Sequence, residues 1–312
     1  RARTLNPIPD PMRADLSQVL GASWISASPV AGGMICGAAR LDTGAGSFFV
    51  KWKNDAPPAF FQCEAEGLGL LRSVGALRVP EVVAVRDLDT APAGVPAYLV
   101  LEFLEIGWRR ATEEFSRRLG RGLAALHRIQ RRQHGLEHDN YLGPFPQSNR
   151  EAASWVEFYR ERRLSPQIEL ARTAGILTGN RLHLVQRAVQ GLEELFVMQS
   201  PVPSLLHGDL WSGNVVAHPS GPALVDPAVY FGDREIELAF MQLFDDFPPA
   251  VFAEYCRQYP LEAGYEMRRP AHQLYPLLVH LNCFGERYGP RLEEACLQVI
   301  EPHRVKESPA QV

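Results

Sequence analysis

The sequence predicts an α+β fold in two lobes, a strand-rich lobe over residues 1–104 and a mainly helical lobe over residues 105–312. Three observations support this prediction. Short β-rich runs surround one helical segment in the first part of the chain, an apolar run follows them, and amphipathic helical patterns fill the remainder. We place the boundary near residues 103–108, so that the first lobe includes the connector.

The first lobe is expected to contain an antiparallel sheet and one helix. AARLDTGAGSFFVKW, residues 38–52, has two strand-like runs around a glycine-rich turn, which is typical of a hairpin. In residues 57–74 apolar side chains recur at helical spacing after two prolines, which favour a helix start. VPEVVAV and AYLVLEFL, residues 79–85 and 97–104, are then two short strands, and the second should be buried.

The second lobe is expected to consist mainly of helices. Residues 112–132 place apolar side chains on one face and arginines on the other, in a helix opened by Thr112. The predicted apolar face is Phe115, Leu119, Leu123, Leu126 and Ile129. Residues 155–171 and 181–198 follow the same pattern, and further helical segments come after the strand-like run at residues 223–231.

Composition narrows the class of protein. A net charge of -4 argues against a nucleic-acid partner, which usually meets a basic face. The five cysteines are scattered and form no CxxC pair, which fits a reducing cytoplasm. The longest apolar stretch is too short to span a membrane, and the first residues do not look like a secretory signal. We therefore expect a cytoplasmic protein without a membrane partner. We make no prediction of its oligomeric state from the sequence.

The segment LLHGDLWSGNVV, residues 205–216, raises the question of function. It places His207, Asp209 and Asn214 close together between two short apolar runs. Glycine, serine, aspartate and asparagine all favour turns, so a polar turn would explain the segment taken alone. The alternative is an active-site loop, and the rest of the chain has to decide between them.

Five residues across the chain match the parts that phosphoryl transfer from a nucleotide requires. Kinases use a strand lysine for the phosphates, a helix carboxylate that holds it, a catalytic aspartate, an asparagine five residues later and a further metal-binding aspartate. The candidates, in that order, are Lys51, Glu64, Asp209, Asn214 and Asp226. Each has an ordinary structural explanation, but their common order and context indicate an ATP and Mg²⁺ site.

Other features carry less weight. Gly32 and Gly33 could form a hairpin that covers phosphates, although a plain turn fits equally well. Glu66 is an alternative to Glu64 as the partner of the lysine. His207 is predicted to brace its loop by hydrogen bonds, and His127 is predicted to be a core histidine.

Several segments resemble the fructosamine kinases, also called ketosamine-3-kinases. They are LLHGDLWSGN, DPAVYFGDREIELA, PLEAGYEMRRP, LYPLLVHLNCFGERY, DNYLG and CEAEGLGLL, within a match from about Ala31 to Tyr288. This family is related to aminoglycoside phosphotransferases and choline kinases and shares the protein-kinase-like fold. The resemblance implies ATP-dependent phosphorylation of the 3-hydroxyl of a ketosamine, which is a glycated amine or glycated protein, as a step of deglycation repair.

The resemblance also implies roles for individual residues. Asp209 would be the catalytic base, Asn214 and Asp226 would bind Mg²⁺, and Lys51 with Glu64 would hold the ATP phosphates. The connector from Glu102 to Leu104 would contact adenine through its backbone. Residues expected near the acceptor are Trp211, Tyr230, Asp233, Arg234 and Glu235.

Two residues depart from the family pattern. Glu237 stands where the family usually has an aspartate that braces the catalytic loop, so we expect a shifted loop or lower activity. Cys36 in the glycine-containing segment could make that segment sensitive to oxidation if its thiolate is accessible.

Two other functions stay open at this point. The first is a small-molecule kinase of the aminoglycoside or choline type, whose acceptor cleft is often lined with carboxylates. An acidic run that includes Glu235, Glu237, Asp245 and Asp246 is compatible with it. The second is a pseudokinase that binds nucleotide and acts as a scaffold, although the complete set of kinase-like residues argues against that function.

Overall fold

The computed structural model describes residues 7–30, 35–107 and 112–301. The contacts divide the chain into two compact units: Arg1–Arg118, Asn140–Pro146 and Gly213–Ala228 form the first, and Leu119–Asp139, Gln147–Ser212 and Val229–Val312 form the second. The sequence had suggested two contiguous lobes. Gly213–Ala228 groups with the first unit because Leu224 donates a backbone hydrogen bond to Arg78 at 2.9 Å and Lys51 pairs with Asp226. The predicted boundary near residues 103–108 stays a prediction.

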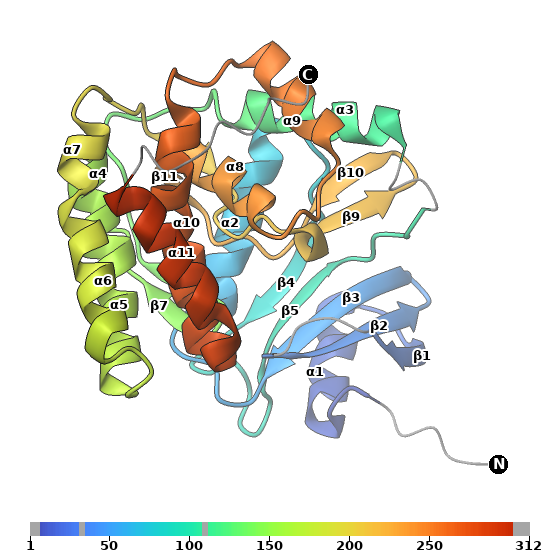
Figure 1. Ribbon diagram of the computed structural model, residues 1–312. Coiled ribbons are helices and arrows are strands. Elements are labelled where there is room, and N and C mark those ends of the chain that lie inside the picture. The colour runs from blue at the N-terminus through green and yellow to red at the C-terminus, as the bar shows by residue number, and fades with distance from the viewer. Residues whose placement is uncertain (1–6, 31–34, 108–111, 302–312) are drawn as a thin grey trace. The chain divides into compact units, whose positions relative to one another are not determined.

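The first unit is built on a five-stranded antiparallel sheet in the order β1-β2-β3-β5-β4 (Figure 1). Its strands are β1 (Trp24–Pro29), β2 (Gly37–Thr43), β3 (Gly46–Lys53), β4 (Val82–Arg86) and β5 (Ala97–Glu102). The predicted β2–β3 hairpin is confirmed, with Thr43 paired with Gly46 across the turn. β5 is buried almost throughout, as its apolar run predicted.

Helix α1 (Asp10–Leu20) was not predicted. Its three prolines, Pro7, Pro9 and Pro11, favour irregular structure, although Met12, Leu16 and Val19 recur at helical spacing. Proline is tolerated in the first turn of a helix because the first N–H groups have no partner in the helix. The helix buries Met12 and Leu16 in the same apolar cluster as Leu41 and Val50 of the sheet, so tertiary packing stabilises it.

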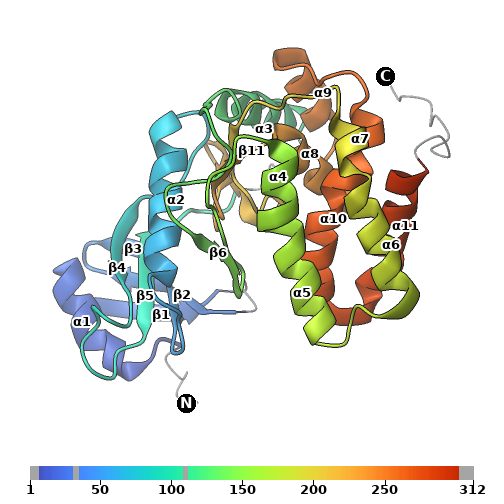
Figure 2. The ribbon, with the colours of Figure 1, turned by 90° about the vertical axis from the view of Figure 1, so that its left-hand side faces the viewer.

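Helix α2 (Phe60–Val74) follows the two prolines, as predicted. Its buried face includes Phe61, Leu68 and Leu71, and Figure 2 shows it beside the sheet. Gly75 ends the helix in the left-handed conformation, which glycine adopts without steric cost. The helix therefore has a fixed face toward the sheet, and this face sets the direction of Glu64.

Six short strands form three two-stranded sheets. They are β6 (Asn140–Leu142) with β7 (Phe145–Gln147), β8 (Ser204–Leu206) with β11 (Tyr230–Gly232), and β9 (Val215–His218) with β10 (Gly221–Leu224). Two strand-like runs differ in extent from the prediction. β3 continues one residue beyond the predicted run at residues 38–52, to Lys53. The predicted run at residues 223–231 is interrupted: β10 ends at Leu224, Asp226 has a positive φ of 54° that cannot extend a strand, and β11 begins at Tyr230.

Most helices belong to the second unit, in which α5, α6, α10 and α11 run side by side (Figures 1 and 2). The helices after α2 are α3 (Glu113–Leu126), α4 (Trp155–Phe158), α5 (Ser165–Thr173), α6 (Gly179–Gln190), α7 (Leu192–Phe196), α8 (Arg234–Leu243), α9 (Pro249–Gln258), α10 (Tyr265–Phe284) and α11 (Gly289–Ile300). The predicted helix at residues 112–132 ends earlier, at Leu126, so Ile129 lies outside it and is 40% exposed.

None of the helices in the described part of the chain is long and apolar enough to cross a membrane. All five cysteines are free thiols.

His134 gives the second unit a predicted pH dependence. Its ring is buried against Trp155 and Phe158, and burial lowers its pKa to about 4. The unfolded chain therefore binds more protons between pH 6.5 and 4, so stability falls as the pH is lowered through that range. We expect the unfolding free energy of the wild type to fall by about 2 kcal/mol more than that of His134→Phe between pH 7 and 4.5.

Urea unfolding at the two pH values measures this difference. The control is His183→Gln, at an exposed position, which should keep the wild-type dependence on pH. Equal losses in the wild type and His134→Phe would show that His134 does not contribute to it.

Candidate active site

Lys51 is the centre of an ion-pair cluster in the first unit. Its Nζ donates to both carboxylate oxygens of Glu64 in α2 at 2.9 Å, and to Oδ1 of Asp226 at 3.0 Å. The side chains of Lys51 and Glu64 are only 10% and 12% exposed, whereas that of Asp226 is 40% exposed. The ammonium thus lies between an interior carboxylate and one that water and solutes can reach.

The charges of this cluster depend on one another. Burial by itself would lower the pKa of Lys51, but the carboxylates of Asp226 and Glu64 raise it. Burial raises the pKa of Glu64, and the Lys51 ammonium opposes that effect. The short contacts between Lys51 and Glu64 favour the state in which both side chains are charged. Glu66, the alternative partner, accepts a hydrogen bond from Gln62 instead.

Asn214 and Asp226 flank the β9–β10 hairpin of the same unit. Asn214 ends a 3-10 helix directly before β9 and is buried. Its amide donates to the backbone oxygen of Asp226 at 3.5 Å, and Val225 donates its N–H to the carbonyl of Asn214 at 3.1 Å. The hairpin therefore returns the chain so that the two predicted metal ligands lie together. Their amide and carboxylate oxygens are hard donors of the kind that Mg²⁺ prefers.

Asp209 lies in the loop that follows β8, in the second unit, and is half-buried. Its backbone N–H donates to Nδ1 of the fully buried His207 at 3.3 Å, and its carbonyl accepts from Trp211 at 3.2 Å. Gly208 has a φ of 84°, a region that favours glycine. His207 thus braces the loop, as predicted.

Glu237 fixes this loop from helix α8. Its Oε1 accepts the backbone N–H of Gly208 at 2.8 Å, and its Oε2 accepts that of His207 at 3.2 Å. Oε2 also lies 3.0 Å from Nε2 of His127, and both side chains are buried. Burial would raise the pKa of Glu237, but its hydrogen bonds with His127 and Gly208 and the nearby imidazole of His207 lower the pKa. The carboxylate is therefore charged, and it satisfies two loop N–H groups.

Replacing Glu237 by the aspartate usual in the family should weaken this brace. The shorter side chain cannot reach both the loop N–H groups and His127 from the same backbone position. We expect Glu237→Asp to lower kcat about 10-fold, because small displacements of a catalytic group are costly, while the Kd for ATP stays unchanged.

Steady-state kinetics and ATP titration test this prediction, with the exposed Glu193→Asp as the control substitution. A Glu237→Asp variant as fast as the wild type would show that the loop does not depend on the reach of this side chain.

Trp211 is the most exposed of the predicted acceptor residues, at 44%. It lies two positions after Asp209, and its neighbour Ser212 donates a hydrogen bond to Asp246 at 3.2 Å. An exposed indole beside a half-buried carboxylate can pack against the C–H face of a sugar ring.

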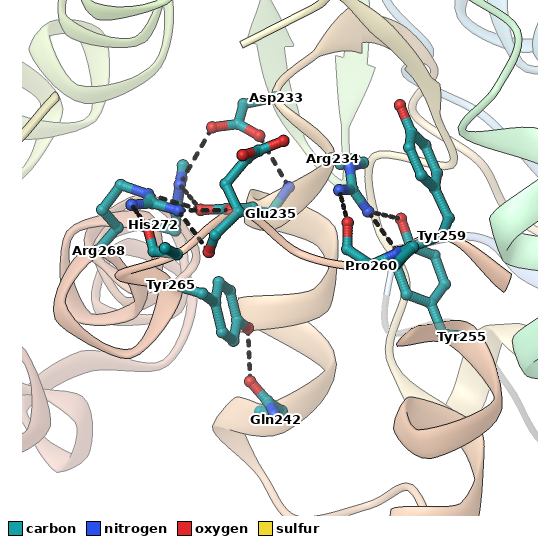
Figure 3. Close-up of polar contacts among 12 residues, drawn as sticks. Asp233, Arg234, Glu235, Gln242, Tyr255, Tyr259, Pro260, Tyr265, Arg268 and His272 are labelled. Carbon is teal, nitrogen blue, oxygen red and sulfur yellow. Dashed lines mark hydrogen bonds and ion pairs between the residues drawn. The ribbon is translucent and has the colours of Figure 1, made fainter. Parts of the chain in front are cut away.

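Other predicted acceptor residues are buried. Helix α8 begins with the buried residues Asp233, Arg234 and Glu235 (Figure 3). Asp233 caps the helix by accepting the N–H of Glu235 at 3.0 Å. Arg268 of α10 donates to both oxygens of Glu235, at 2.9 and 2.8 Å. Partners inside the protein thus explain why these charged side chains are buried.

Tyr230 is also buried, and Arg163 explains why. The Arg163 guanidinium lies 4.0 Å from the centroid of the Tyr230 ring and donates to the Ser148 carbonyl and the Asn149 side chain. Arg163 belongs to a π-helical turn, Tyr159–Leu164, between α4 and α5. The sequence had suggested one continuous helix, but the extra residue in the turn directs this arginine inward.

A second group of possible metal ligands lies at the start of α8. Ligand atoms of Asp233, Glu235 and His272 lie within 4.8 Å of one another, and all three residues are buried (Figure 3). Although burial opposes it, the two carboxylates raise the pKa of His272. The two carboxylates face the Arg268 guanidinium and an imidazole whose protonated form they favour, so we interpret the group as a structural ion-pair network.

The two residues of the connector that were predicted to contact adenine, Glu102 and Leu104, differ in their backbone hydrogen bonds. The Glu102 N–H donates to the Glu81 carbonyl at 2.9 Å, and its carboxylate pairs with Arg78. Its N–H is thus already bonded, whereas the backbone of Leu104 forms no hydrogen bond with another residue of the described chain.

Gly32 and Gly33 lie outside the described residues. Cys36, close after them, is half-buried, and burial raises the pKa of its thiol. A raised pKa makes the reactive thiolate scarce at neutral pH, which does not favour the oxidation sensitivity considered from the sequence.

Sequence reasoning missed the connection between His127 and the catalytic loop. His127 was predicted to be a core histidine, which its burial confirms, but its contact with Glu237 was not expected. Both residues are polar positions within apolar helical patterns. That signal suggests a buried polar pair, but it does not identify the partner.

Comparison with known proteins gives consistent results. The family model described as fructosamine kinase matches residues 11–301. A protein named probable ketoamine kinase from Lactiplantibacillus plantarum is 36% identical over 271 residues, covering 86% of this chain and 92% of that protein. The chloroplastic protein-ribulosamine 3-kinase of Arabidopsis thaliana is 36% identical over 267 residues, covering 83% of this chain and 78% of that protein.

Solved structures extend the comparison to the fold. The crystal structure of a putative fructosamine-3-kinase from Thermobifida fusca matches with a TM-score of 0.83 and 32% identity, covering 93% of this chain and 98% of that one. Aminoglycoside phosphotransferase APH(4)-Ia, in a complex with AMP-PNP and hygromycin B, matches with a TM-score of 0.64 at 16% identity, covering 96% of this chain and 100% of that one. The second likeness concerns the protein-kinase-like fold alone.

Proposed function

The chain belongs to the fructosamine kinase family, and on this premise we propose that it transfers the γ-phosphoryl group of ATP to the 3-hydroxyl of a ketosamine. A ketosamine forms when glucose, ribose or a related sugar reacts with an amino group of an amino acid or a protein. Its 3-phosphate is unstable and releases the amine, so the activity repairs glycation. We place the reaction in the cytoplasm, where the five free cysteines would stay reduced.

The observation that carries the kinase proposal is the Lys51 ammonium held by Glu64 and Asp226. A lysine fixed by a helix carboxylate presents its charge at one position, which suits the phosphates of ATP. We assign Lys51 to the phosphates and Glu64 to holding it. The backbone of Leu104, which has no hydrogen bond to another described residue, is assigned to adenine.

Asp209 is assigned as the base that accepts the proton of the 3-hydroxyl. As the 3-oxygen of the sugar forms its bond to the γ-phosphorus, the bond from that phosphorus to the bridging oxygen of ADP breaks. The proton of the 3-hydroxyl passes to the Asp209 carboxylate, and ADP leaves. The bonds from Glu237 to the loop keep Asp209 in one orientation during this step.

Asn214 and Asp226 are assigned to Mg²⁺. Their oxygen donors fit this ion, and Asp226 is exposed enough to receive it. When bound, the ion neutralises charge on the phosphates. Asp226 would then be shared between Lys51 and the ion, which its two carboxylate oxygens allow.

Trp211 is assigned to the sugar ring of the acceptor because it alone among the predicted acceptor residues is exposed. Tyr230, Asp233, Arg234 and Glu235 are assigned to supporting structure instead, since they are buried with partners inside the protein.

Incubation with Mg-ATP and one acceptor at a time tests the proposal. The acceptors are ribulosyl-lysine, fructosyl-lysine, kanamycin and choline, and the readouts are ADP release and phosphorus NMR of the product. We expect ADP and a sugar 3-phosphate with at least one of the two glycated lysines.

Two results would overturn the proposal. Turnover with kanamycin or choline alone would identify a different small-molecule kinase. Tight ATP binding without turnover of any acceptor would identify a nucleotide-binding scaffold.

A further inference from the structure

A chain of polar contacts inside the second unit ends on the catalytic loop. Arg234, at the start of α8, donates through Nη1 to the hydroxyl oxygen of Tyr255 at 3.0 Å (Figure 3). The Tyr255 hydroxyl lies 2.7 Å from Nδ1 of His127, and Nε2 of His127 lies 3.0 Å from Oε2 of Glu237. Glu237 accepts the loop N–H groups described above.

Arg234 is held firmly at the outer end of this chain. It donates to the carbonyls of Tyr259, at 2.9 Å, and of Pro260, and its guanidinium lies 3.7 Å from the centroid of the Tyr259 ring. Tyr255 and His127 are both fully buried. The intermediate groups are therefore shielded from bulk solvent.

The chemistry of the groups fixes the direction of each hydrogen bond. A guanidinium can only donate, so the Tyr255 oxygen accepts from Arg234 and its own proton is left to donate. Nδ1 of His127 is the remaining polar atom in contact with this buried hydroxyl in the described part of the chain, so the hydroxyl donates to Nδ1, which is then unprotonated. The ring carries its proton on Nε2 and donates it to the Glu237 carboxylate, which can only accept. Donation thus runs one way, from Arg234 to Glu237.

We propose that Tyr255, oriented by Arg234, is a positioning residue that acts through His127 and Glu237 on the catalytic loop. The tyrosine hydroxyl selects the tautomer of His127 that donates to Glu237. The opposite tautomer would place a lone pair of Nε2 against the carboxylate and push Glu237 away from the loop. The effect on catalysis rests on the proposed kinase function, whereas the tautomer does not.

Two tyrosine variants separate positioning from packing. Tyr255→Phe removes the hydroxyl from the chain of contacts. Tyr265→Phe removes a similarly buried hydroxyl that donates to Gln242, also in α8, at 2.6 Å and takes no part in the chain (Figure 3). We expect similar losses of Tm in both variants. Only Tyr255→Phe should lower kcat, about 10-fold, with KM for ATP within about twofold of the wild type.

Nitrogen NMR of the His127 ring tests the inference without any substrate. In the wild type we expect a protonated Nε2 and an unprotonated Nδ1, and in Tyr255→Phe the Nδ1 signal should shift because its donor is gone. A wild-type ring protonated on Nδ1 would overturn the inference, as would equal kcat losses in the two variants. If the wild type turned over no acceptor, the proposed function would fail, and the ring signals would still decide the tautomer.

Discussion

Asp209→Asn is expected to lower kcat about 10³-fold, with the Kd for ATP within about twofold of the wild type. Positioned general bases contribute factors of roughly 10² to 10⁴, and asparagine cannot accept the proton of the acceptor hydroxyl. The substitution keeps the size of the side chain. It also keeps the backbone contacts with His207 and Trp211 that shape the loop. The loss should therefore fall on the chemical step.

Kinetics with a glycated lysine and calorimetric titration with Mg-ATP measure the two quantities separately. Asp89→Asn makes the same chemical change at an exposed position in the first unit and should leave kcat unchanged. If Asp209→Asn retained more than a tenth of the wild-type rate, another group would have to be the base.

Local patterns in the sequence predicted much of the first unit. Alternation around a glycine-rich turn indicated the β2–β3 hairpin, and apolar spacing after two prolines indicated α2. Those two elements direct Lys51 and Glu64 toward each other, so their pair could be anticipated. Helix α1 was missed because its three prolines favour irregular structure, although Met12, Leu16 and Val19 recur at helical spacing and a proline in the first turn is typical of a helix start.

Long-range partners explain why the acceptor residues were harder to predict. Asp233, Arg234 and Glu235 look like exposed site residues because three charged side chains in a row rarely lie in a core. Their partners, such as Arg268 and Tyr255, come from helices later in the chain. Periodicity within a segment does not identify such partners, so burial could be assigned only from the structure.

Lys51→Met should lower both stability and activity, and its two effects can be separated. Removing the ammonium leaves Glu64 buried without a counter-charge, which typically costs about 3–5 kcal/mol of unfolding free energy. We also expect kcat/KM for ATP to fall roughly 10²-fold or more, as when one fixed donor to a transition-state charge is lost.

The double variant Lys51→Met, Glu64→Met provides the control. Replacing a buried ion pair by apolar side chains is often close to neutral, so its unfolding free energy should return to within about 2 kcal/mol of the wild type. Its activity should stay lost, because the phosphates still lack their lysine. A double variant that recovered activity together with stability would show that Lys51 serves the fold alone.

The pH dependence of the single variant gives an independent check on Glu64. Without Lys51, burial and the neighbouring Asp226 raise the pKa of Glu64 unopposed. A carboxyl with a raised pKa in the folded state binds more protons there than in the unfolded chain, so stability increases as the pH falls. The deficit of Lys51→Met relative to the wild type should therefore be smaller at pH 5 than at pH 8 in urea unfolding. A deficit independent of pH would mean that lost packing, and not an unpaired charge, destabilises the variant.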